Sequence, residues 1–289
     1  MSLGIAFKGA EGVVLAADSR VTLNNVVDIP GAVPGAVQKA LIPATFDSAT
    51  KLLNVKSQTH VGAVTFGTAS IGQAAPRTVA SFLPEFEDEL SKAKKGRLSV
   101  ENFANKLGEF FTAQWATAKM PTPAAPGNEM IFLVGGYDEG APHGRVFTVS
   151  VPNAPKAVEF AANDFGATWG GQRQFVDRLL TGFDPGISQH IYDALNIAAN
   201  QRQPAILNQE LTKKLALPIP WQFLPLQDCI DLCIFLIRTT IQVQQWVVAL
   251  RGVGGAIDVA TITRTGGFKI VQVKELKGDD MFATLRSYS

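Results

Sequence analysis

The chain has 289 residues, of which 46% are hydrophobic and 18% are charged. This length suffices for one large core that closes without disulfides or a structural metal, and the low charged fraction, against a usual ~25%, predicts that partner subunits cover part of an apolar surface. The 26 Lys and Arg residues nearly balance the 25 Asp and Glu residues, and the net charge of +1 excludes the strongly basic surface typical of nucleic-acid binders.

The first part of the chain predicts two pairs of strands separated by a long loop. Residues 3–8 and 13–17 are rich in apolar and β-forming residues, and the glycines between them are typical of a turn, so they predict a hairpin. Residues 24–50 contain three prolines and no clear periodicity, which predicts a long loop with a functional or interface role. Residues 51–55 and 61–66 predict the second strand pair.

Two helices and another hairpin follow. Apolar residues recur at helical spacing over residues 71–92 and 99–118, and Ser99 is the expected N-cap of the second helix. The apolar run 130–136 predicts a buried strand, and residues 145–150 predict its hairpin partner.

The last part of the chain predicts two more helices and a closing hairpin. A helix is expected near Gln172, then an irregular stretch with five prolines over residues 183–226, then a helix over 226–250. Strands are expected at 256–263 and 268–273 around a Gly-Gly turn. Because the strands occur as hairpins between pairs of helices, we predict an α+β domain with two packed antiparallel sheets and helices outside both.

The cysteines and the apolar segments give no sign of a metal centre or of a membrane span. Cys229 and Cys233 lie one helical turn apart, and the three histidines are scattered, so we expect core cysteines in a reducing compartment. The most apolar stretch, residues 229–237, is much shorter than the ~20 residues of a transmembrane helix. The start of the sequence has no basic leader and carries acidic residues early, at Glu11 and Asp18, so we expect no signal peptide. We therefore predict a cytoplasmic protein with no cofactor, no metal and no nucleic-acid or membrane partner.

A serine at position 2 is the first candidate for chemistry. Removal of Met1 would leave a hydroxyl and a free α-amine on Ser2, and the ordinary pKa of such an amine, ~7.7–8.0, suits it as the base for its own hydroxyl. Asp18 and Lys51 follow on the next strands and supply a carboxylate and an ammonium group. These residue types are more often found at surface turns, so spacing alone does not establish catalysis.

Four blocks of sequence resemble the β-type subunits of proteasomes, which are N-terminal-nucleophile hydrolases. The blocks occur in the order of that family and together frame most of the chain: residues 12–22, 51–55, 132–138 and 254–264. The resemblance implies a single domain over residues 1–289 with the four-layer αββα sandwich of that fold. Relative to the family, it implies insertions at about 24–50 and 181–226.

The resemblance also implies a set of site residues. Ser2 matches the nucleophile, Asp18 and Lys51 match the acid–lysine pair, and Gly67 matches the glycine whose N–H helps to form the oxyanion hole. Five further residues match or adjoin the cleft where an extended peptide binds: Arg20, Val21, Thr22, Thr65 and Ala69.

Three departures from the family pattern concern the groups around the nucleophile. The nucleophile is serine where the family has threonine. The segment 169–172 lacks the serine of the family's Gly-Ser-Gly turn, and no acidic residue occurs from 232 to 257, where the family has an aspartate. Thr168 and Gln172 are candidates to substitute for the missing groups.

We therefore predict a peptidase subunit that uses Ser2 on peptide or unfolded-protein substrates within stacked homo-oligomeric rings. An ATP-dependent unfoldase remains open as a further partner. Two other functions also remain open. One is a ring-forming structural or binding homologue whose site has decayed, which the departures favour. The other is a dedicated amidase or acyl transferase on the same fold.

Overall fold

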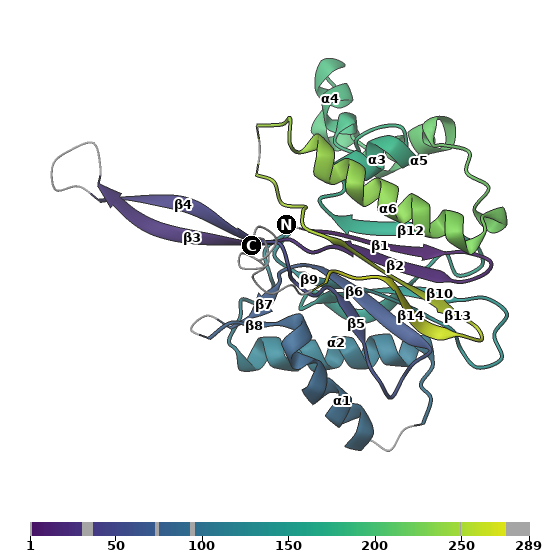
Figure 1. The fold of residues 1–289 in the computed structure, drawn as a ribbon. Coiled ribbons are helices and arrows are strands. Elements are labelled where there is room, and N and C mark those ends of the chain that lie inside the picture. Colours follow the sequence, from purple (N-terminus) through teal and green to yellow (C-terminus); the bar gives the residue numbers. More distant parts are fainter. Residues whose placement is uncertain (1, 31–36, 73–74, 93–95, 249, 276–289) are drawn as a thin grey trace, which may run out of the picture.

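The structure is a computed structural model that describes residues 2–30, 37–72, 75–92, 96–248 and 250–275. The fold is α+β, and the described residues form antiparallel sheets and six α-helices (Figure 1). Two sheets have five strands each, and two smaller sheets have two strands each.

The first large sheet contains both ends of the described chain. Its strands lie in the order β12 (Gly166–Gly171), β1 (Leu3–Lys8), β2 (Val13–Asp18), β13 (Ile257–Thr263) and β14 (Gly267–Gln272). Every neighbouring pair is antiparallel. β1 and β2 are buried along their whole length, which places the start of the chain in the centre of the molecule.

The second large sheet is built from the middle of the chain. Its strands lie in the order β11 (Ala154–Phe160), β10 (Arg145–Val151), β9 (Met130–Gly136), β6 (Val61–Gly67) and β5 (Leu52–Asn54), all antiparallel. Buried apolar residues of both sheets, among them Leu15 and Leu133, form one cluster. The two sheets therefore pack against each other.

Helices pack on the outside of each sheet, as Figure 1 shows. α2 (Val100–Thr117) lies on β9, β10 and β11, and α1 (Leu83–Lys92) joins it through an aromatic cluster around Phe86 and Phe103. α6 (Leu226–Val243) lies on β1, β2 and β13 and contacts α3 (Gln174–Leu180). Cys229 and Cys233 lie on the buried side of α6 and form no disulfide, which confirms them as core residues, and burial raises the pKa of Cys229 to about 11.

Most elements expected from the sequence are present. The hairpins β1–β2, β9–β10 and β13–β14 and the pair β5–β6 are confirmed. Ser99 is the N-cap of α2, where its Oγ accepts a hydrogen bond from the Asn102 N–H at 3.2 Å.

Three expectations about helices need correction. The helix expected over residues 71–92 begins only at Leu83, because Pro84 fits the first turn of a helix and not its interior. The preceding residues form β7 (Ser70–Ile71), β8 (Arg77–Thr78) and η1 (Val79–Phe82). α6 ends at Val243 rather than near residue 250. The irregular stretch contains helices: α4 (Ile187–Ala194), η2 (Ala199–Gln201), α5 (Pro204–Leu215) and η3 (Trp221–Phe223).

The prediction of a long loop over residues 24–50 is wrong for most of that range. β3 (Val21–Pro30) and β4 (Val37–Phe46) pair in continuous antiparallel register and form an arm that projects from the body (Figure 1). Both strands are edges of a two-stranded sheet, where proline is tolerated because one side of each strand needs no donor. Pro30 and Pro43 therefore lie within the strands without breaking them. Their presence made the sequence look like a loop rather than two strands.

No helix in the described ranges is long and apolar enough to cross a membrane.

Packing between the two large sheets requires glycine opposite Phe66. The Phe66 ring is 6% exposed and lies against Gly4 and Gly170 of the facing sheet. A Cβ on Gly170 would stand 2.3 Å from the ring, and a Cβ on Gly4 would stand 2.6 Å from it. These two glycines let the sheets approach at the point where β6 reaches β1 and β12.

Substitution of Gly170 by alanine should lower the free energy of unfolding by about 1–3 kcal/mol, because the added methyl overpacks a closed contact. Gly96→Ala is the matched control, since a Cβ there meets nothing within 4 Å, and we expect a change below about 0.5 kcal/mol. Urea unfolding of the two variants measures the difference. Equal midpoints would show that the sheets tolerate more separation than the structure implies.

Candidate active site

The carboxylate of Asp18 is at the centre of the site. Asp18 ends β2 and is fully buried. Its Oδ1 accepts hydrogen bonds from the Leu3 N–H at 2.9 Å and from Lys51 Nζ at 2.6 Å. Its Oδ2 accepts from the N–H groups of Arg20 at 3.1 Å and Gly254 at 3.0 Å. Three of the four donors are backbone groups, so the carboxylate stays satisfied even without the lysine.

Lys51 is the charged partner of Asp18 and is 4% exposed. It directly precedes β5, and its carbonyl accepts a hydrogen bond from the Thr65 N–H at 3.0 Å, which ties it to β6. Burial lowers the pKa of Lys51 below its ordinary value, while the charge and hydrogen bond of Asp18 oppose this change. A buried lysine of lowered pKa exchanges its proton more readily near neutral pH than a surface lysine does.

A second buried ion pair lies in the same sheet. Asp258 of β13 is 1% exposed and binds Lys274 Nζ at 2.5 Å, and the Ser19 hydroxyl donates to its Oδ2 at 3.4 Å. The Lys274 charge lowers the pKa of Lys51, and the Asp258 charge raises it. The two ion pairs are therefore electrostatically coupled.

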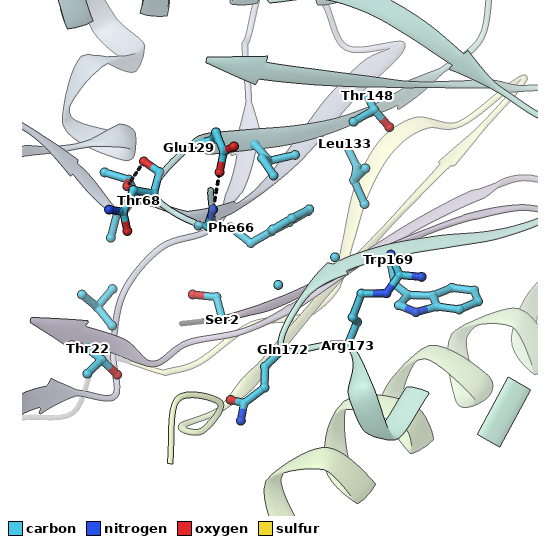
Figure 2. A pocket seen from close by; sticks show the side chains of 18 of the residues that line it. Ser2, Thr22, Phe66, Thr68, Glu129, Leu133, Thr148, Trp169, Gln172 and Arg173 are labelled. Carbon is cyan, nitrogen blue, oxygen red and sulfur yellow. Dashed lines mark hydrogen bonds between the residues drawn. The ribbon is translucent and has the colours of Figure 1, made fainter. Parts of the chain in front are cut away.

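Two adjoining cavities meet at Ser2. The larger has a volume of about 710 Å³ and the smaller about 270 Å³. Six residues line both: Ser2, Val21, Phe66, Gly67, Thr68 and Ala69. Figure 2 shows the Ser2 side chain in the larger cavity, between Thr22 on one side and Phe66 and Thr68 on the other.

Ser2 is held by its own backbone. Its carbonyl accepts a hydrogen bond from the Gln172 N–H at 2.8 Å, directly before β1 pairs with β12. Gly171 has φ +93, and a Cβ there would stand 1.9 Å from the Ser2 carbonyl oxygen. Only glycine permits this close approach. The Ser2 side chain is 3% exposed and shares the smaller cavity with Lys51.

Gly67 forms the wall opposite Ser2. It has φ +86, and a Cβ there would stand 2.1 Å from the Glu129 carbonyl oxygen. The next residue, Thr68, donates its N–H to that same carbonyl at 2.9 Å. The turn that ends β6 is thus fixed against the loop before β9, with Gly67 lining both cavities.

The structure brings most of the expected site residues together. Val21 and Ala69 line both cavities, Thr22 lines the larger one and Thr65 the smaller one. Within the part of the chain that the structure describes, the buried hydroxyls of Thr22 and Thr65 have no hydrogen-bond partner. Such groups are rare in folded proteins and are free to bind a polar ligand.

Arg20 does not line either cavity. Its guanidinium binds Asp47 at 2.5 and 2.7 Å and donates to the Arg251 carbonyl at 3.2 Å. The hydrogen bonds that Arg20 donates to Asp47 raise the pKa of Arg20 and lower the pKa of Asp47. Arg20 thus joins the base of the arm to the loop before β13.

Sequence reasoning missed part of the larger cavity. Glu129, Arg173 and Trp169 line it, with Glu129 in the loop before β9 and the other two around the end of β12 (Figure 2). Trp169 Nε1 and the Arg173 guanidinium both donate to Asp177, a buried residue of α3. β12 itself was not expected as a strand, although the family resemblance had placed the segment 169–172 beside the nucleophile. Among the residues with described positions, no group of three His, Cys, Asp or Glu could hold a metal ion.

Comparison with solved structures shows which known proteins share this fold. No protein-family model matches the chain, and no curated protein matches it. Solved structures of Anbu proteins do match over nearly the whole chain. The Anbu (Gly-1) mutant from Hyphomicrobium sp. strain MC1 has a TM-score of 0.51 at 15% identity, covering 100% of this chain and 96% of that one.

Two further Anbu structures agree. Anbu (ancestral beta-subunit) from Yersinia bercovieri has a TM-score of 0.51 at 15% identity, covering 99% of this chain and 92% of that one. The helical assembly of the Anbu complex from Pseudomonas aeruginosa has a TM-score of 0.53 at 14% identity, covering 99% and 91%. At such identities the similarity shows a shared fold and no more.

The assignment to proteasome β-type subunits is therefore wrong. The three structures described above are Anbu proteins, which are proteasome-like but distinct, and no family model supports the β-type assignment. The four sequence blocks are the strands and turns around Asp18, Lys51, β9 and β13. A fold that uses these strands and turns produces similar blocks, so the blocks do not distinguish one family from another.

Replacement of Asp18 should cost more stability than replacement of Lys51. Asp18→Asn turns one oxygen into an NH₂ group that faces backbone donors, and we expect a loss of about 3–5 kcal/mol. Lys51→Met leaves the carboxylate with its three backbone donors, and we expect about 1–3 kcal/mol. Chemical unfolding measures both. Asp47→Asn is the control, because it breaks a more exposed ion pair worth at most about 1 kcal/mol. A larger loss for Lys51→Met than for Asp18→Asn would contradict this account of the site.

Proposed function

We propose that this chain is an N-terminal-nucleophile hydrolase of peptide bonds, with the four-layer αββα sandwich of that class and Ser2 as nucleophile after loss of Met1. The observation that carries the proposal is the position of Ser2: it lies where the two cavities meet, and it shares the smaller one with a buried lysine of lowered pKa. A serine with only a structural role would not need a buried lysine of lowered pKa in the same cavity. The pair therefore favours a catalytic role for Ser2.

In the proposed reaction the Ser2 amine takes the proton of the Ser2 hydroxyl as its oxygen attacks the peptide carbonyl. The Gly67 N–H stabilises the oxyanion, and collapse expels the leaving amine with that proton and forms an ester on Ser2. Water then attacks the ester, which releases the acid and restores the hydroxyl. The Lys51 ammonium group, held by Asp18, lowers the pKa of the Ser2 amine and so keeps it available as a base.

The larger cavity is the proposed binding site of an extended peptide. Strand β3 begins at Val21 and forms one wall, and the end of β6 forms the other, so both offer backbone groups to a peptide. The unpartnered hydroxyls of Thr22 and Thr65 are further donors to its carbonyls, and Ala69 leaves room for a side chain. Arg20 acts in this proposal by fixing the start of β3.

Self-association is the second part of the proposal. The structure from Pseudomonas aeruginosa, which shares this fold, is described as a helical assembly of the Anbu complex. We propose that copies of this chain likewise assemble, each as one domain over residues 1–289. An unfoldase partner and a cytoplasmic location stay predictions from the sequence.

The first measurement is the intact mass of the protein purified from cells with normal methionine aminopeptidase. We expect the mass of the chain without Met1. A peptide electrophile that reacts with a hydroxyl and an amine of the same residue should then label Ser2. A protein that keeps Met1 has no free amine at Ser2, and this outcome would leave the inactive structural homologue as the better account.

Ser2→Ala should reduce peptide hydrolysis by at least ~10³-fold and abolish labelling, because both reactions need the hydroxyl. Ser91→Ala is the control, since Ser91 is exposed on α1 and lines neither cavity, and it should keep the wild-type rate. Ser2→Thr should keep labelling. Undiminished cleavage by Ser2→Ala would refute the mechanism, and activity restricted to one small amide would assign the same site to a dedicated amidase.

A further inference from the structure

Among the described side chains, one face of the β3–β4 arm is mostly apolar. The register pairs Val21 with Phe46 and Ile29 with Gln38, and side chains alternate between faces along each strand. Gln38 is the one polar residue among the described side chains of this face, which we name the apolar arm face: Val21, Leu23, Val27, Ile29, Gln38, Ala40, Ile42, Ala44 and Phe46.

Much of the apolar arm face is open to solvent in the single chain. Leu23 is 40% exposed, Ile42 is 50% exposed and Phe46 is 59% exposed. A two-stranded hairpin alone is at best marginally stable in water, and contiguous apolar patches on soluble proteins usually mark an interaction site. An exposed apolar face of this kind is typical of a surface that a partner covers.

The opposite face of the arm is suited to solvent. It carries both charged residues of the two strands, Asp28 and Lys39, which lie directly opposite each other in the register and are exposed. One acid and one base leave the arm without net charge. The apolar arm face itself carries no charged residue, so it offers nothing that would attract a strongly acidic or basic macromolecule.

A second exposed apolar segment lies on the loop that follows α6, and hydrogen bonds link this loop to the base of the arm. Arg20 at the base of the arm donates to the Arg251 carbonyl at 3.2 Å, and Arg251 donates to the Gln245 carbonyl at 3.3 Å. The next residues, Trp246 and Val248, are 78% and 106% exposed. Figure 1 shows this loop, in yellow-green, on the side of the body from which the arm projects.

The size of the combined surface fits an interface between copies. Strands of ten residues extend ~33 Å and a pair of strands is ~10 Å wide, so one face of the arm offers ~330 Å². Trp246 and the two valines after it bring the surface to the order of 600 Å². A reciprocal contact of two copies would bury about twice that area, which reaches the ~1,200 Å² of a stable interface.

We infer that the apolar arm face and residues 246–248 form the surface through which one copy binds a second copy of this chain. This inference rests on the self-association proposed above and assigns the surface responsible for it. Interfaces within homo-oligomers are more apolar and poorer in charge than those between independent proteins. A net charge of +1 also leaves little repulsion between copies.

Two lysine substitutions on opposite faces of β4 test the inference. Ile42→Lys puts a charge on the apolar arm face, and Val37→Lys puts the same charge on the opposite face, where the wild-type valine is 69% exposed. Sedimentation velocity over a wide range of protein concentration should show an association constant at least ~30-fold lower for Ile42→Lys. Val37→Lys should associate within ~3-fold of the wild-type chain.

Each other result overturns the inference. A wild-type chain that stays a single copy at every concentration, or two variants that associate equally, would exclude this surface. Unchanged association of Ile42→Lys with slower labelling of Ser2 would assign the face to substrate. Far-UV circular dichroism confirms that each variant folds. The Ser2→Ala chain should assemble like the wild type, so that a failure of the proposed hydrolysis is distinguishable from a failure of this interface.

Discussion

The buried carboxylate of Asp18 is the constraint on which the site depends. A charge without solvent contact is tolerated only when its oxygens are paired. Here the partners come from backbone segments far apart in the sequence, at Leu3, Arg20 and Gly254, and from the side chain of Lys51. One side chain therefore fixes the starts of β1, β3 and β5 and the loop before β13 relative to each other.

The walls of the cleft follow from this arrangement. Ser2 precedes Leu3 and Val21 follows Arg20, so two residues that line the cleft are neighbours of residues bound to Asp18. The other wall belongs to the second sheet, where β6 ends at Gly67 after Phe66 has filled the space against Gly170. Pairing of a buried charge and close packing of two sheets thus produce a single cavity system.

Sequence reasoning succeeded where the signal is local. The hairpin β1–β2 has its turn residues between its strands, and Ser99 stands directly before the helix that it caps. The backbone donors of Asp18 could not be found, because an N–H group has no residue-type signature. The arm was missed for a different reason: the apolar residues of β3 and β4 face solvent in the single chain, and prolines that usually break strands are tolerated at edges.

The arm connects assembly to the cleft. β3 starts in the cleft wall at Val21 and runs outward as part of a ribbon that is marginally stable alone. Arg20 fixes only its base, through Asp47 and the Arg251 carbonyl. A partner that covers the apolar arm face would order the whole strand, including the residues beside Ser2. If a ligand of the cleft orders the same strand, linkage requires that binding of a second copy and binding of substrate favour each other by the same factor.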